Sequence, residues 1–452
     1  MRKLLISILL FCFIAFKVSA QYQSTQTHLL PSPLTTPMDV QVYDMNMDSL
    51  PDIIGITRTN GSTENTVKLY LNQGDKTFTL TEFGTKGGIM EQLTVGDVSG
   101  DGYPDIIAAS SSHLQYWIND GNLNFTEFDF YTGTWLTDVS IGDIDNDNKQ
   151  EVITSDLFGG EIRIYFFNNN TISSSLIDTA EWGANKAKIA NLNADSLPDI
   201  IAAYKSQDEI VWYENIGQGF IKHVIDSSMN DPIDVAVSDI NLDGFNDIAA
   251  TSLNNGIVCY FQDSLGNFTK QQVEPDSTIA WSKDINIVDL NNDQLPDILS
   301  ASETLDYVAF WENQGNNKFI KRIIAEDIGG PIGVAYGDFD MDNDLDVVCS
   351  AFWDYEFYWF EMEDITSDID NSNASASFSI YPNPAQEILK ISFDPFMDSG
   401  NLRVLSIDGK LIHSQELIDN NPVLNVKSLK PGMYLLQIET NNSNTIKRFI
   451  KK

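Results

Sequence analysis

Basic residues, histidines and cysteines are all scarce in this chain. Its 452 residues include 27 Lys and Arg against 65 Asp and Glu, so the formal net charge is -38. A chain this acidic repels nucleic acid and anionic membrane surfaces, and we expect neither as a partner. The four histidines and three cysteines leave little material for zinc or copper sites or for a disulfide framework.

Long apolar runs are also lacking, except at the start of the chain. Residues 1–20 combine the positive charges of Arg2 and Lys3 with an apolar stretch that ends in Val18-Ser19-Ala20. This pattern predicts a signal peptide over 1–20, because the uncharged apolar run is too short to span a bilayer. No later segment is long and apolar enough to span, so we expect no transmembrane segment in the mature chain. Cys259 and Cys349 lie in apolar runs and are expected to be buried.

A repeated acidic nonapeptide organises residues 21–364. It begins at Asp44, Asp97, Asp143, Asn191, Asp239, Asp289 and Asp338, at intervals close to 50 residues. Each copy is followed by an apolar run rich in β-branched residues, a polar turn, a strand with an aromatic residue at a fixed place, and further short strands. Four short strands per repeat predict one blade of a β-propeller, and seven repeats predict seven blades. The fold class is therefore all-β, with no helical periodicity in this region.

The aromatic column of the repeat consists of Tyr70, Trp117, Tyr165, Tyr213, Tyr260, Trp311 and Phe360. A residue type that recurs in every blade is what uniform packing between sheets requires, so we expect these rings to pack between neighbouring blades. The seventh unit stops after its aromatic strand, whereas the segment before Asp44 resembles the missing part of a unit. We therefore expect residues 22–43 to complete the seventh blade and close the ring.

The acidic loops have the chemistry of calcium sites. Calcium prefers six to eight oxygen ligands on a tightly turning loop, and positions one, three, five and nine of the nonapeptide carry side-chain oxygens. Position seven can add a backbone carbonyl. Hard oxygen ligands exclude zinc and copper. The fourth loop has only two carboxylates, Asp195 and Asp199, beside Asn191 and Asn193, and is expected to bind most weakly.

The units resemble the FG-GAP/VCBS repeats of integrin-α-like propellers, as the segment DLNNDQLPDILSASETLDYVAFWENQGNNKF at 289–319 illustrates. The resemblance implies up to seven Ca2+ sites within the blades. Only Gly102 and Gly244 supply the glycine usual at position six, which leaves the turn geometry of the other loops open. The implied metal ligands are Asp44, Asn46, Asp48, Asp52, Asp97, Ser99, Asp101, Asp105, Asp143, Asp145, Asp147, Glu151, Asn191, Asn193, Asp195, Asp199, Asp239, Asn241, Asp243, Asp247, Asp289, Asn291, Asp293, Asp297, Asp338, Asp340, Asp342 and Asp346.

A different module follows a polar linker at 365–377. Residues 378–452 contain the short strands ILKISF, LRVLSI and MYLLQIET, and predict a small Ig-like β-sandwich. Tyr381-Pro382-Asn383-Pro384, the segment LKPGMYLLQI at 429–438 and the terminal Lys447-Arg448-Phe449 resemble the type A C-terminal sorting domain of the Bacteroidota type IX secretion system. The resemblance implies the type IX machinery as a partner, and secretion or display at the outer surface of a Gram-negative cell. A generic adhesive domain is the alternative.

Two classes of function stay open from the sequence. The first is a non-catalytic module that binds an extracellular glycan or protein, and the second is an extracellular enzyme such as a polysaccharide lyase or a calcium-dependent hydrolase. Propellers host both, so the fold does not choose between them. We favour binding, with no catalytic residues, because arginines and histidines are sparse and neither G-x-S-x-G nor H-E-x-x-H occurs. The turns that differ most between units place His113, Asp156, Asp208 and Asp306 as polar candidates for ligand contact.

Overall fold

The computed structural model describes residues 21–30, 35–59, 65–84, 88–132, 135–168, 171–180, 183–193, 195–274, 283–365, 377–381, 385–394, 400–406, 410–417, 422–430, 432–439 and 444–452. The predicted signal peptide and nearly all of the predicted linker lie outside these residues. The chain divides into two compact units, Met1–Ile365 and Thr366–Lys452. Every regular element in the described residues is a strand, so they include no helix that could cross a membrane.

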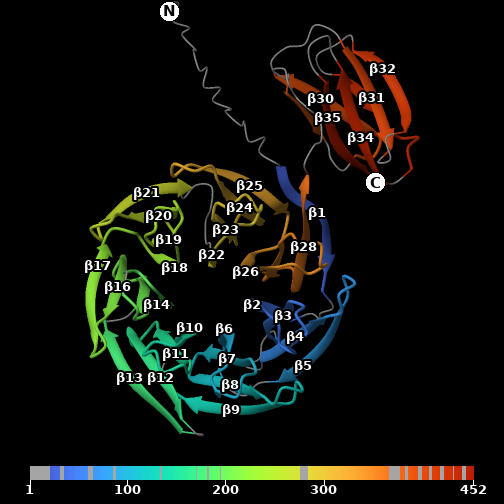
Figure 1. Ribbon diagram of the computed structural model, residues 1–452. Helices are drawn as coiled ribbons and strands as arrows, with labels where there is room; N and C mark the ends of the chain where they lie inside the picture. Colours follow the sequence, from blue (N-terminus) through green and yellow to red (C-terminus); the bar gives the residue numbers. More distant parts are fainter. Residues whose placement is uncertain are drawn as a thin grey trace, which may run out of the picture. The chain divides into compact units, whose positions relative to one another are not determined.

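Seven four-stranded antiparallel sheets form a ring around a central axis (Figure 1). The first sheet contains β2 (Thr36–Tyr43), β3 (Asp52–Arg58), β4 (Asn65–Asn72) and β5 (Phe78–Gly84), and the second contains β6 (Met90–Gly96), β7 (Asp105–Ser110), β8 (His113–Asn119) and β9 (Phe125–Tyr131). The third contains β10 (Leu136–Gly142), β11 (Glu151–Asp156), β12 (Glu161–Asn168) and β13 (Thr171–Thr179), and the fourth contains β14 (Ala184–Ala190), β15 (Asp199–Tyr204), β16 (Glu209–Asn215) and β17 (Phe220–Asp226). The fifth contains β18 (Pro232–Ser238), β19 (Asp247–Ser252), β20 (Gly256–Gln262) and β21 (Phe268–Glu274), and the sixth contains β22 (Ile285–Val288), β23 (Asp297–Ser302), β24 (Tyr307–Asn313) and β25 (Phe319–Glu326). The seventh contains β26 (Pro331–Gly337), β27 (Asp346–Ala351), β28 (Glu356–Ile365) and β1 (Gln21–Leu29). The predicted seven-bladed propeller is confirmed.

Burial changes from strand to strand across each sheet. The second strand, such as β7 or β15, is buried at every residue because its apolar run is covered on both faces by the neighbouring sheets. The outermost strand, such as β17, leaves many of its side chains exposed or half-buried. The acidic loop joins the innermost strand of each sheet to the second strand, so the repeat as it appears in the sequence is offset from the sheet by one strand.

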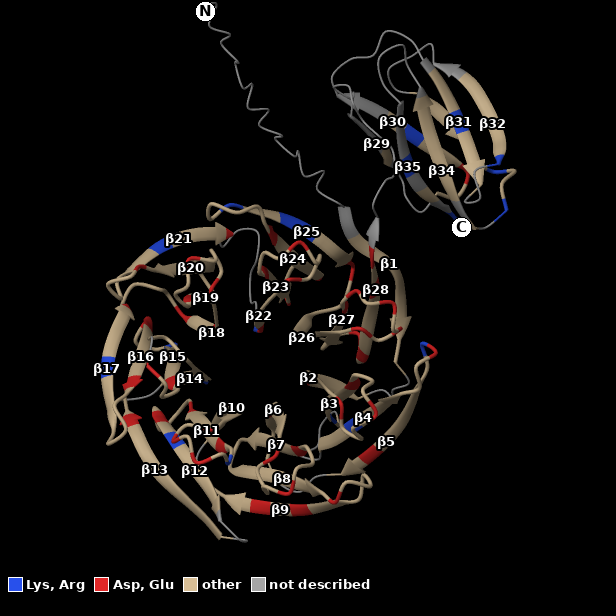
Figure 2. Ribbon diagram, in the orientation of Figure 1, with Lys and Arg blue, Asp and Glu red and all other residues tan. Residues whose placement is uncertain are grey.

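The aromatic column packs between neighbouring sheets, as the sequence predicted. Tyr213 lies in a core cluster with residues of the third sheet, and Tyr260 packs with residues of the fourth. Three of these rings also hold a carboxylate of the preceding sheet: the Tyr213 hydroxyl donates to Asp178 (2.6 Å), Tyr260 donates to Asp226 (2.6 Å), and the Trp311 indole donates to Glu274 (3.1 Å). Each carboxylate also pairs with a lysine of an outermost strand: Lys222 of β17, Lys270 of β21 or Lys321 of β25. Figure 2 shows basic segments on these strands.

Ring closure differs from the prediction for residues 22–43. Only β1 joins the seventh sheet, where it pairs with β28 from Gln21↔Ile365 to Leu29↔Tyr358. β2 is instead the innermost strand of the first sheet and pairs with β3. The reason is the offset described above: the strand before each acidic loop belongs to the same sheet as the strand after it. Closure therefore depends on a single strand, which protects the edge of β28.

The second unit is a small β-sandwich of two antiparallel sheets. One sheet has the order β29-β30-β33, and the other has the order β32-β31-β34-β35. Their bounds are β29 (Ser377–Tyr381), β30 (Ile388–Asp394), β31 (Gly400–Ser406), β32 (Leu411–Leu417), β33 (Val423–Asn425), β34 (Gly432–Glu439) and β35 (Asn444–Lys451). Leu389, Leu402, Leu436 and Phe449 contribute buried side chains from both sheets to one core. The predicted sandwich is confirmed.

Candidate metal centres and ligand face

The acidic loops occupy one end of the seven innermost strands. Because every sheet has the same strand order and the same connection from its innermost to its second strand, the loops share one face of the ring. The turns between the second and third strands lie on the opposite face. The ring thus presents two chemically distinct faces, and the candidate sites fall on both.

Backbone hydrogen bonds curl each acidic loop around its own carboxylates. In the first loop, Asp44 accepts the N–H groups of Asp48 (3.0 Å) and Ser49 (2.7 Å), and Asp48 accepts the N–H of Leu50 (2.9 Å). The loops that begin at Asp97, Asp143, Asp239, Asp289 and Asp338 repeat this pattern. These hydrogen bonds give the six loops one tight turn, and a calcium loop needs such a turn.

The turn does not require glycine at position six. Ser49, Asn148, Gln294 and Asn343 all adopt positive φ values there, between 65° and 73°. Gly102 and Gly244, the two glycines at this position, have φ values of 93°. The left-handed conformation costs a residue with a side chain some free energy, which these loops offset with their hydrogen bonds to the first carboxylate. The four loops without this glycine therefore keep the same turn as the two loops that have it.

Position nine has a second role that the sequence analysis missed. Asp52 is fully buried, and its two oxygens accept the N–H groups of Met45 (2.9 Å) and Asn72 (2.9 Å), which joins the loop to the third strand. Asp346 accepts those of Phe339 and Met362 in the same way (both 2.9 Å). The equivalent carboxylates Asp105, Asp199, Asp247 and Asp297 are also fully buried and also accept at least two backbone donors.

Burial raises the pKa of the position-nine carboxyl groups. The pKa rises to about 6 for Asp52, to about 7 for Glu151 and to about 8 for Asp297 and Asp346. Desolvation is the main cause, and the other acids of the same loop add repulsion. A divalent cation in the loop would reverse both effects, because it prefers the ionised oxygens and neutralises their neighbours.

The third and seventh loops bring three carboxylates together. Ligand oxygens of Asp143, Asp145 and Glu151 all lie within 4.8 Å of one another, as do those of Asp338, Asp340 and Asp346. Oxygens bound to one Ca2+ at 2.3–2.6 Å lie at most about 5 Å apart, so both groups fit a single ion. Glu151, which departs from the usual Asp, reaches the same place with its longer side chain. In the fourth loop the Asn191 amide donates to the Asp195 carbonyl at 3.5 Å, in place of a carboxylate that accepts backbone donors.

A second set of acids, which the sequence analysis also missed, lies on the innermost strands or directly before them. Asp39, Asp138, Asp234 and Asp284 stand five residues before the first residue of their loops, and each is buried. Their carboxylates accept N–H groups from the innermost strand of the next sheet, at Leu93, Ala187, Ile285 and Val334 (2.9–3.1 Å). The recurrence of aspartate at one offset was the signal that could have identified them. These aspartates join neighbouring sheets around the centre of the ring.

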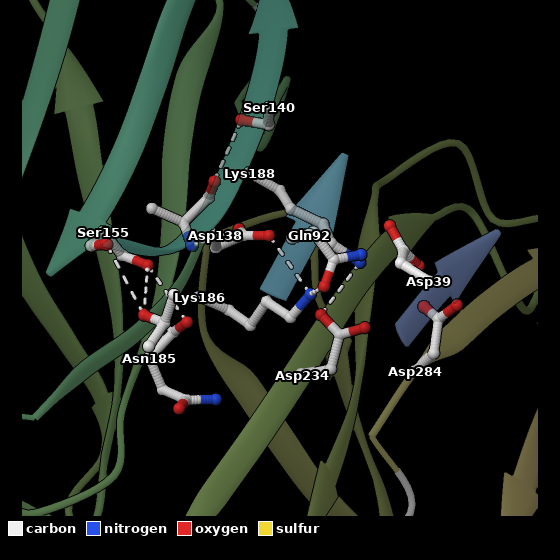
Figure 3. Close-up of polar contacts among 12 residues, drawn as sticks. Asp39, Gln92, Asp138, Ser140, Ser155, Asn185, Lys186, Lys188, Asp234 and Asp284 are labelled. Atoms are coloured by element: carbon white, nitrogen blue, oxygen red, sulfur yellow. Dashed lines mark hydrogen bonds and ion pairs between the residues drawn. The ribbon is translucent and has the colours of Figure 1, made fainter. Parts of the chain in front are cut away.

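Two lysines of β14 partly neutralise these acids. Figure 3 shows Lys186 directed toward Asp138 (3.1 Å) and Gln92 (2.7 Å), while Lys188 pairs with Asp234 (2.8 Å). Burial alone would lower the pKa of Lys186, but the carboxylates outweigh it and raise that pKa. Burial and the neighbouring Asp284 raise the pKa of Asp39 to about 8.

A cavity of about 150 Å³ lies near the starts of the innermost strands, on the face away from the acidic loops. Asp39, Glu91, Lys186, Lys205, Lys283 and Asp284 are among the residues that line it. On the same face Phe158 and Trp353 are each 58% exposed, in the turns after β11 and β27. Large exposed rings on the same face as convergent polar groups are typical of a binding face. Phe158 belongs to a turn that the sequence analysis singled out, whereas Trp353 was not anticipated.

The four polar candidates on this face have local roles. The carboxylate of Asp208 accepts the N–H of Asp231 (2.9 Å), and that of Asp306 accepts the N–H of Gly330 (3.0 Å). Asp156 accepts two N–H groups of its own turn, and the His113 ring hydrogen-bonds to Ser112 (2.9 Å). They belong to four different sheets, and each makes the contacts named here within its own turn or with a neighbouring one.

Comparisons with known proteins match both parts of the chain. A model of the FG-GAP-like repeat matches residues 44–108, 97–154, 191–250, 239–300 and 289–349, more than half of the chain, and a secretion system C-terminal sorting domain matches 379–452. No curated protein matches the sequence. A solved structure of catalytically inactive virginiamycin B lyase from Staphylococcus aureus, with quinupristin, is similar over 75% of this chain and 99% of that chain, with a TM-score of 0.52 and 11% identity. The Dos1 propeller is similar over 75% of this chain and 95% of that chain, with a TM-score of 0.45 and 11% identity. At 11% identity the likeness to the lyase shows the fold alone.

Proposed function

The chain belongs to the FG-GAP-like repeat family and ends in a secretion system C-terminal sorting domain, and from this premise we propose that its ring is a calcium-binding module that captures an extracellular glycan or protein without chemically changing it. The sorting domain implies export to the cell surface or the medium. The type IX machinery is the partner that this export requires. Calcium stabilises the ring, and the face away from the calcium loops binds the ligand.

The convergence of three carboxylates in the third and seventh loops carries the calcium proposal. Asp143, Asp145 and Glu151 are drawn together by backbone hydrogen bonds despite their mutual repulsion, and their oxygens are hard ligands. Calcium would take further oxygens from position five and from the carbonyl at position seven. The ion supplies charge and ordering to the loop, while the chain supplies a preformed turn.

Calcium removal tests this part of the proposal. Each site filled at a hundredfold excess over its Kd stabilises the folded ring by about 2.7 kcal/mol. For a body of roughly 345 residues the entropy of unfolding is about 0.7 kcal/mol/K, so each such site is worth about 4 °C in Tm. We expect EGTA to lower the Tm by many degrees, and calcium, but not zinc, to restore it. An unchanged Tm at low ionic strength would contradict the calcium assignment.

The exposed aromatic residues carry the ligand part of the proposal. Phe158 packs edge-to-face on Trp135 with ring centroids 5.5 Å apart, and Lys283 lies 5.9 Å from the Phe352 ring centroid beside Trp353. Rings held in this way lose little entropy on binding, and the cavity on the same face is lined by both acidic and basic side chains. This is the combination that a glycan or a polar protein loop uses.

A glycan array and a capture assay with single variants test the ligand face. We expect Trp353→Ala and Phe158→Ala to weaken capture at least tenfold with unchanged Tm. Leu265→Ala is the matched control, because Leu265 is 83% exposed in a turn on the side of the acidic loops. Equal loss in the control would contradict the assigned face. Turnover of a polysaccharide or ester by the purified ring would establish an enzyme instead.

A further inference from the structure

A lysine from the first sheet lies against the seventh acidic loop. Lys76, in the turn between β4 and β5, places its Nζ 2.8 Å from Asp340 Oδ2 and 3.0 Å from Glu361 Oε1. Asp340 is position three of that loop and belongs to its convergent carboxylate group. An ammonium ion therefore already neutralises one of the oxygens that a metal would use.

The equivalent turn of the second sheet has no cation at this place. Asn72 donates to the Phe339 carbonyl of the seventh loop (3.0 Å), and Asn119 donates in the same way to the Met45 carbonyl of the first loop (3.2 Å), so corresponding turns meet successive loops. Leu123 occupies the position of Lys76, with a φ of 60° against 67°. The turn therefore does not require a lysine at this position.

One oxygen of the Asp340 carboxylate is buried without a hydrogen-bond partner among the residues that the structure describes, as an oxygen that binds a cation would be. The Asp340 side chain is 1% exposed, and the oxygen without a partner is Oδ1. Asp344 Oδ1 in the same loop is likewise buried without one. Buried carboxylate oxygens are costly when unsatisfied, so the loop has capacity for a cation beyond Lys76.

We propose that Lys76 is an internal competitor that weakens calcium binding at the seventh loop and links that loop to ring closure. This inference rests on the proposed calcium-binding function. A calcium ion on Asp338, Asp340 and Asp346 brings two positive charges beside the ammonium group, which must move away from Asp340 toward Glu361. Glu361 also pairs through Oε2 with His28 of β1 (3.1 Å). The movement of Lys76 toward Glu361 therefore changes the contacts of the strand that closes the ring. The seventh loop then binds calcium more weakly than its five acids would otherwise allow.

Calcium titration of the full chain by calorimetry, with a chelator competition, tests the competition. We expect Lys76→Leu, which installs the residue of the second sheet, to tighten one dissociation constant by roughly tenfold or more. Lys318→Leu, in the corresponding turn of the sixth sheet, should change none. In an Asp340→Asn background the Lys76→Leu effect should vanish. If the parent chain binds calcium and Lys76→Leu leaves its isotherm unchanged, the competition is refuted while the calcium function stands. If the parent chain binds no calcium, both are refuted.

A second readout follows the closing strand. In calcium-free buffer Lys76→Gln, which removes the charge and shortens the side chain by one atom, should speed hydrogen exchange of the β1 amides several-fold relative to the parent chain. With calcium bound, hydrogen exchange of the β1 amides in the parent chain should stay slow, because the Lys76 ammonium group then pairs with Glu361. Equal β1 exchange in the two calcium-free proteins would overturn the link to closure. This measurement needs only a folded ring, and it remains decisive if Lys76→Leu fails to fold.

Discussion

Replacing Lys186 by methionine should test whether the buried ion pair between Lys186 and Asp138 at the centre of the ring stabilises the fold. The Lys186 side chain is 5% exposed and pairs with Asp138, which is 2% exposed, so both charges are buried. Methionine keeps the length and packing of the lysine but leaves Asp138 without its counter-charge. Breaking a buried pair in this way costs about 3–5 kcal/mol. With an unfolding entropy of about 0.7 kcal/mol/K for the ring, the Tm should fall by about 5 °C at pH 8.

The pH dependence separates charge from packing. Lowering the pH toward 5 protonates buried acids such as Asp39, whose pKa is about 8, and Asp284, whose pKa is about 6. The difference in Tm between Lys186→Met and the parent chain should therefore shrink as the pH falls, at a fixed calcium concentration. Lys222→Met is the control, since its lysine is 39% exposed and surface pairs contribute about 0–1 kcal/mol. Identical melting curves at pH 8, or a difference that does not depend on pH, would refute the reasoning.

Three further outcomes are expected. Because the pKa of Asp39 is raised to about 8, the folded ring holds this proton more tightly than the unfolded chain does. The stability that the bound proton adds is complete below the ordinary pKa near 4 and is lost as the pH rises through about 8. Asp39→Asn should therefore flatten the fall in Tm between pH 5 and pH 8. Deleting residues 21–30 exposes the edge of β28 and should cause aggregation or loss of cooperative unfolding, measured by light scattering and calorimetry, whereas a soluble truncation with unchanged melting would show that β1 is dispensable. Deleting 378–452 should leave the ring folded but retained inside the cell envelope, and its normal appearance outside the cell would contradict the sorting assignment.

Local sequence pattern was sufficient for the architecture. The interval of the acidic nonapeptide predicted the seven sheets, and the fixed aromatic position predicted the packing of Tyr213 and Tyr260 between them. The error concerned closure, because a sequence repeat does not say where one sheet ends and the next begins. β2 and β1 were assigned together, although the hydrogen-bond registers place them in different sheets.

Contacts between distant segments were beyond the sequence. Lys76 and Asp340 are separated by most of the ring in sequence and become neighbours only when the first and seventh sheets meet. The double role of Asp52 could not be deduced either, since its backbone donors come from Met45 and Asn72. As a result, a substitution at position nine tests folding as much as metal binding, and position three, at Asp145 or Asp340, is the better place to test calcium.

Anomalous diffraction from crystals of the full chain grown in calcium would test the central claim most directly. The account predicts anomalous peaks inside the acidic loops, with a clear peak among Asp143, Asp145 and Glu151 and the weakest density at the loop that begins at Asn191. The seventh loop should fill only at higher calcium concentration than the third, and at lower concentration in Lys76→Leu. Loops that stay empty at millimolar calcium, with their carboxylates in the same positions, would contradict the proposal that this ring is a calcium-binding module.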